Sequence, residues 1–138
     1  MKFAYIRLMI KASLFWLIFG STTGIILFLQ RKYINVPLYI LPSHSHIILV
    51  GFLIQFIFGV AFWMFPRMPG GVFTSPSKGW LIFALINLGT LTRGIFEPIF
   101  QKSEIVFWFA FLGGIMQFFS IFIGALEISK RVRNPSYS

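Results

Sequence analysis

Four long apolar segments, separated by charged residues, proline or glycine, dominate the sequence. They run from Ala12 to Leu29, from Ile47 to Phe65, from Trp80 to Phe100 and from Ile105 to Leu126. Each is close to the ~20 residues that an α-helix needs to cross ~30 Å of hydrocarbon. A membrane β-barrel would show shorter segments of alternating polarity, which this sequence lacks. The segments therefore predict an all-α integral membrane protein, a bundle of four transmembrane helices.

The composition supports this class. Hydrophobic residues make up 57% of the 138 residues and charged residues only 11%, against about 25% charged in ordinary soluble domains. So few charges cannot cover a soluble globule. We expect one domain over residues 1–138, with helices at about 8–29, 43–65, 80–100 and 104–128. The first apolar segment exceeds the roughly 7–15 residues of a signal peptide and no small-residue cleavage site follows it, so we expect it to be retained as an anchor.

Basic residues flank the segments and predict their orientation. With the N-terminus inside, most of them lie on the cytoplasmic side, as the positive-inside rule requires: Lys2, Arg7, Lys11, Arg67, Lys78, Lys130, Arg131 and Arg133. The outer side then receives Arg31, Lys32 and Lys102. This distribution predicts an N-in, C-in, multi-pass protein of the bacterial inner membrane. It also explains the net charge of +9 without a nucleic-acid partner, so membrane lipid is the expected surrounding.

The residue inventory excludes several kinds of chemistry. The sequence has no cysteine and no aspartate, and its only acidic residues are Glu97, Glu104 and Glu127. Disulfides, thiolate metal sites and iron–sulfur clusters are therefore excluded. Carboxylate-rich calcium and two-metal sites are excluded as well. No nucleotide-binding loop or convincing hydrolase triad is present.

Polar residues at membrane depth are costly and are therefore the candidate functional residues. The only histidines, His44 and His46, begin the second apolar segment at the outer boundary. Arg93 and Glu97 are spaced i, i+4 on the third segment, near the same level, and can pair. Imidazole ligates haem iron and arginine pairs with propionates. The alternative is that Arg93 and Glu97 only neutralise each other while the histidines lie among lipid headgroups.

The spacing of the histidines limits how they can act. Residues two apart on an α-helix point about 200° apart, so within regular helix both cannot bind one metal. His44 shares a face with Gly51 and Gln55, which is suited to a planar ring, whereas His46 shares a face with Leu53 and Ile57. We therefore expect His44 to face the bundle and His46 to face a second site, a neighbouring chain or lipid. A helix that begins only near Ser45 would allow both imidazoles to converge.

Three amide side chains lie near the middle of the membrane: Gln55, Asn87 and Gln117. Interhelical hydrogen bonding is the role we expect for them, at roughly 0.6–2 kcal/mol each.

Two motifs resemble the small four-helix membrane proteins related to subunit I of haem-copper (cbb3-type) oxidases and nitric oxide reductases. The first is His44-Ser-His46-x4-Gly51-Phe52-x2-Gln55-x3-Gly59-Val60-Ala61-x-Trp63-Met64-Phe65-Pro66-Arg67. The second is Asn87-Leu-Gly89-x3-Arg93-x3-Glu97-Pro98. The resemblance implies a haem b protein in which His44 or His46 ligates the iron and Arg93 contacts a propionate. It leaves open which histidine is the ligand.

The chain departs from that family in its histidine count. A complete oxidase or reductase needs further histidines for a second haem and a metal centre, so catalysis at a binuclear centre within one chain is excluded. We expect electron transfer or binding of nitric oxide or oxygen, in a homo-oligomer or with respiratory-type partner subunits, and quinol as a candidate donor. One alternative is a copper- or other metal-binding accessory protein that uses His44 and His46. Another is a structural subunit or small transporter without a cofactor.

Overall fold

The computed structural model describes residues 4–33, 39–65 and 75–132, and these ranges contain helices and no strand. Four helical spans are long and apolar enough to cross a membrane: Ala4–Tyr33, Ile40–Met64, Pro76–Lys102 and Glu104–Ser129. The predicted bundle of four apolar helices is confirmed. The predicted helix bounds lie within four residues of the observed ones.

The second span changes its winding along its length. It consists of α2 (Ile40–His46), a π-helix η1 (Ile47–Ile54) and α3 (Gln55–Met64). Its last turn gives way to extended backbone at Phe65, directly before a proline, where the helical conformation is disfavoured. A π-helix has more residues per turn than an α-helix. A residue before η1 and a residue after it therefore do not lie on the common face that regular α-helical spacing predicts.

The third span ends in a tighter turn than it begins. Helix α4 (Pro76–Phe96) passes into a 3₁₀ helix, η2 (Glu97–Lys102). Pro98 lies at the start of η2 and cannot donate a backbone hydrogen bond, so it disrupts the α-helical pattern. The carbonyl of Pro98 accepts the backbone N–H of Tyr39 at 3.0 Å. This bond joins the start of the second span to the end of the third.

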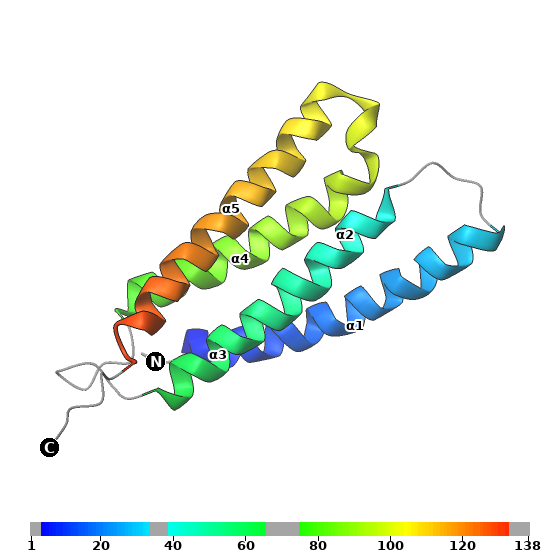
Figure 1. Ribbon diagram of the computed structural model, residues 1–138. Coiled ribbons are helices and arrows are strands. Elements are labelled where there is room, and N and C mark those ends of the chain that lie inside the picture. The colour runs from blue at the N-terminus through cyan, green and yellow to red at the C-terminus, as the bar shows by residue number, and fades with distance from the viewer. Residues whose placement is uncertain (1–3, 34–38, 66–74, 133–138) are drawn as a thin grey trace, which may run out of the picture.

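The spans form two hairpins, α1 (Ala4–Tyr33) with the second span and α4 with α5 (Glu104–Ser129), as Figure 1 shows. The hairpins meet mainly through α4. They are bonded where Tyr39 donates to Pro98, and they also pack together at the opposite end, where α1 begins and α5 ends. There the Phe62 ring lies 5.1 Å from the Arg131 guanidinium, and the Tyr5 and Trp80 rings are 6.3 Å apart. One cluster of buried hydrophobic side chains lies at this same end and consists of Tyr5, Ile6, Met9, Phe58, Phe62 and Ile82. Other hydrophobic residues, among them Ile47 and Ile86, are buried elsewhere along the bundle.

Helices α4 and α5 approach most closely at a pair of glycines. A Cβ atom on Gly89 would lie 2.7 Å from the Gly113 carbonyl oxygen, and one on Gly113 would lie 3.0 Å from the Gly89 oxygen. Both contacts are with backbone, which cannot move as a flexible side chain can. Small residues that allow such close approach are a usual device in membrane helix packing.

We expect Gly113→Ala to lower the free energy of unfolding by about 1–3 kcal/mol, the usual range for overpacking. The neighbouring Gly114→Ala is the matched control. Its Cβ would lie 3.5 Å from the nearest neighbouring atom, so its effect is expected within about 0.5 kcal/mol. Unfolding of purified protein in mixed micelles measures both values. Equal losses for the two variants would contradict this packing.

Candidate functional site

A network of polar side chains joins three spans near the end of the bundle where the second span begins and the third span ends. Arg93 Nη2 donates to Glu97 Oε1 at 2.6 Å, and His46 Nδ1 donates to Glu97 Oε2 at 3.0 Å. Arg93 Nη1 also donates to Gln117 Oε1 at 3.4 Å, and Gln117 Nε2 donates to Thr90 Oγ1 at 3.1 Å. We call these five residues the Glu97 cluster. The predicted Arg93–Glu97 pair is confirmed.

Local structure positions the Glu97 cluster. Glu97 is the first residue of η2, and Arg93 lies one turn earlier on α4, so the two side chains share a face. The Glu97 side chain is only 11% exposed. Each of its carboxylate oxygens accepts a bond from a different partner, so the buried charge is paired, as membrane depth requires.

The two histidines face different helices. His44 Nδ1 lies 2.9 Å from the Gly20 carbonyl oxygen and 3.2 Å from Thr23 Oγ1, both on α1. His46 instead contacts Glu97 on the third span. Because α2 begins at Ile40, both histidines lie in regular helix, and they do not converge on one metal. His44 therefore faces the bundle, as expected. His46, which we expected to face a second site, a neighbouring chain or lipid, contacts Glu97 of the third span within the same chain.

The hydrogen bonds also determine the tautomers of the two imidazoles. The Gly20 carbonyl can only accept a hydrogen bond, and so can the ionised Glu97 carboxylate, so Nδ1 carries the proton on both rings. In the neutral ring Nε2 then holds the lone pair. Metal-binding histidines usually have this arrangement, with Nδ1–H donated to a carbonyl or carboxylate that orients the ring.

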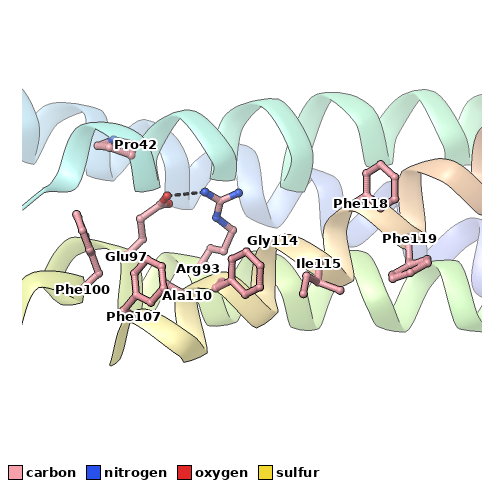
Figure 2. Close-up of a pocket in the computed structure, with 11 residues that line it drawn as sticks. Pro42, Arg93, Glu97, Phe100, Phe107, Ala110, Gly114, Ile115, Phe118 and Phe119 are labelled. Atoms are coloured by element: carbon pink, nitrogen blue, oxygen red, sulfur yellow. Dashed lines mark hydrogen bonds and ion pairs between the residues drawn. The ribbon is translucent and has the colours of Figure 1, made fainter. Parts of the chain in front are cut away.

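A groove lies beside the Glu97 cluster, between α2 and α5. Its volume is about 760 Å³, within the roughly 300–1,000 Å³ range of small-molecule and cofactor sites. Figure 2 shows Arg93 and Glu97 in this groove with aromatic side chains around them. His46 does not line it, but lies one helical turn from Pro42, which does. The lining is Pro42, Arg93, Glu97, Phe100, Phe107, Ala110, Phe111, Gly114, Ile115, Phe118 and Phe119.

The other two predicted site residues lie in the bundle interior. A Cβ on Gly51 would lie 2.7 Å from Thr90 Cγ2 and 3.0 Å from Trp16 Cγ, so this glycine lets three spans approach one another. Gln55 is fully buried, and neither of its amide atoms has a hydrogen-bond partner among the described residues. Neither residue lines the groove. Their contact with a cofactor stays a prediction.

The three membrane amides differ in their bonding. Gln117 joins α5 to α4 through Thr90 and Arg93, and Asn87 accepts the Trp16 indole N–H at 2.8 Å. Interhelical hydrogen bonding is therefore confirmed for these two. For Gln55 the expectation was wrong, because the side chain is buried without such a bond.

We expect Gln55→Met to be neutral or to raise the free energy of unfolding by about 1 kcal/mol, because it removes unpaired buried polar atoms. Gln117→Met is the same chemical change at an amide that is bonded, and we expect it to cost about 1–3 kcal/mol. The two variants are compared by unfolding in mixed micelles. A larger loss for Gln55→Met than for Gln117→Met would contradict the bonding described above.

The sequence analysis missed the aromatic groove. It assigned no phenylalanine of the fourth segment to a site, yet Phe107, Phe111, Phe118 and Phe119 line the groove. Their spacing places Phe107, Phe111 and Phe118 along one stripe of a helix, which is the only signal that could have indicated a shared surface.

Comparison of the chain with protein-family models, with curated proteins and with solved structures found no match. The likeness to haem-copper oxidase subunit I thus rests on the motif residues alone. Of those residues, the structure brings His46, Arg93 and Glu97 together in one cluster.

Proposed function

We propose that this protein binds haem b in the membrane and acts in electron transfer or in the binding of nitric oxide or oxygen. The observation that carries the proposal is His46, whose Nδ1 is held by Glu97 at 3.0 Å beside the aromatic groove. A ring oriented in this way offers Nε2 as a ligand. The haem supplies an iron that changes redox state or binds a diatomic gas.

The residues around the groove fit a haem on three counts. The volume of about 760 Å³ is large enough for a cofactor. Phenylalanine walls suit a planar conjugated ring and exclude water. Arg93 keeps one buried donor, Nε, without a hydrogen-bond partner among the described residues, and an arginine is well suited to a propionate. Arg93 is thus the candidate propionate partner. His46, which lies beside the groove without lining it, is the candidate iron ligand.

A second protein ligand to the same iron is not available from the nearby candidates in the chain. His44 faces α1. Met64 lies 18 residues after His46 on the same helical span, about 27 Å away at helical rise, and Met116 does not line the groove. With none of these three side chains in reach, a second chain is our candidate source of another iron ligand. This supports a homo-oligomer or a complex with respiratory-type subunits, with quinol as a candidate donor.

The proposed function includes a location in the cell. We assign the protein to the bacterial inner membrane with both termini in the cytoplasm, because basic residues flank the spans at that end.

The proposal is tested by haem and metal analysis of protein purified after haem-supplemented expression. We expect haem b and iron in equal amounts. Copper without porphyrin would replace the proposal with the alternative of a metal-binding accessory protein. No group of three or more His, Cys, Asp or Glu side chains that could hold a metal occurs in the described ranges. Protein that contains neither haem nor copper would favour the alternative of a structural subunit without a cofactor.

A further inference from the structure

A second charged group lies at the opposite end of the bundle, where α5 ends. Glu127 Oε1 accepts from Lys78 Nζ at 3.1 Å and from Lys130 Nζ at 3.0 Å. Arg131 follows directly and is only 4% exposed. We call Lys78, Glu127, Lys130 and Arg131 the terminal basic cluster. It holds three cations and one carboxylate, and that carboxylate is already shared by both lysines.

Arg131 is incompletely bonded for a buried cation. Its Nη1 donates to the Phe62 carbonyl at 3.4 Å, and its guanidinium lies 5.1 Å from the centre of the Phe62 ring. Its Nε and Nη2 are buried and have no hydrogen-bond partner among the described residues. These two atoms form one edge of the guanidinium, the edge that binds a phosphate or carboxylate through two parallel bonds. Burial also lowers the pKa of Arg131, while the charges of Tyr5 and Glu127 oppose this shift.

The position of this cluster indicates which anion would complete it. Arg131 lies in the turn just after α5 ends at Ser129, at the boundary of the membrane-spanning segment where lipid phosphates lie. The side chains of Lys78 and Lys130 are 48% exposed, so a headgroup can approach from their side. Basic pockets between transmembrane helices are known to bind anionic headgroups.

We propose that the terminal basic cluster binds the phosphate of an anionic phospholipid. The two lysines attract the headgroup, and Arg131 turns its Nε–Nη2 edge outwards, by rotation of its side chain, to hold the phosphate through two bonds. The bound lipid would supply the negative charge that Glu127 alone does not. This site is separate from the groove at the other end of the bundle, so it does not depend on haem binding.

The test is a titration of the purified full-length protein in neutral detergent with dioleoylphosphatidylglycerol, followed by the thermal unfolding midpoint. We expect the midpoint to rise with this lipid and not with zwitterionic dioleoylphosphatidylcholine. For Arg131→Lys, which keeps the charge but loses one of the two parallel hydrogen bonds, we expect half-saturation at a lipid concentration about fivefold higher. Arg7→Gln removes a charge from an exposed position on α1 near the same end and is expected to behave as the wild type.

Lys130→Gln changes a half-exposed position and serves as a second variant if Arg131 variants fold poorly. We expect it to raise the lipid concentration at half-saturation by a similar factor of about five. Unchanged half-saturation in both variants would overturn the proposal. An equal rise of the midpoint with inorganic phosphate alone would also overturn the lipid assignment, because it would indicate a site for free phosphate.

Discussion

His46→Ala is expected to lower the haem bound per chain by at least about tenfold. Loss of even an outer-shell partner commonly costs about 10–100-fold in metal affinity, and His46 is the candidate ligand itself. His44→Ala is the matched control, because it makes the same chemical change two residues away on a ring that faces α1. We expect it to retain most of the haem. The ratio of Soret absorbance to protein in the purified variants measures the effect.

The helical content of both variants, from circular dichroism, separates loss of haem from loss of fold. A greater loss of haem in His44→Ala would place the iron on the α1 side of the bundle and contradict the assignment to His46. Full haem binding by a variant that lacks both histidines would reject axial ligation by histidine altogether.

Glu97→Gln is expected to lower the free energy of unfolding by about 3–5 kcal/mol, the usual cost of breaking a buried ion pair from one side. In the wild type the Glu97 carboxylate accepts a hydrogen bond from the Arg93 guanidinium at 2.6 Å. The substitution removes this negative charge and leaves the guanidinium unpaired at membrane depth. It also removes the acceptor that orients His46, so haem affinity should fall by about 10–100-fold. Unfolding in mixed micelles and haem titration measure the two effects.

Glu104→Gln is the matched control for this change. Glu104 is exposed at the first residue of α5, near the same end of the bundle, and its substitution removes the same charge. We expect it to alter stability by less than about 0.5 kcal/mol. Similar losses for the two variants would mean that the Glu97 cluster contributes nothing beyond net charge.

The four spans could be predicted from the sequence because the length of an apolar segment directly reflects the thickness of a bilayer. The Arg93–Glu97 pair could be predicted because it depends only on spacing within one helix. The π-helix η1 could not, since no glycine or proline pattern in Ile47–Ile54 distinguishes it from α-helix.

The orientation of the histidines and the existence of the groove depend on how the two hairpins meet. Either histidine could have faced the third span, and the packing of α2 between α1 and α4 decides for His46. The phenylalanines of α5 have the same pattern whether they face lipid or a groove. These phenylalanines become walls of a site only because α5, α4 and the start of α2 together line one groove.

The most direct test of the account is the visible spectrum of the purified protein, oxidised and then reduced with dithionite. A haem held by His46 predicts a Soret band in both states. Sharp reduced α and β bands would indicate six-coordinate iron with a ligand from a second chain, whereas a broad reduced spectrum that shifts with carbon monoxide would indicate an open site for gas. Absence of a Soret band after haem-supplemented expression would contradict the proposed function.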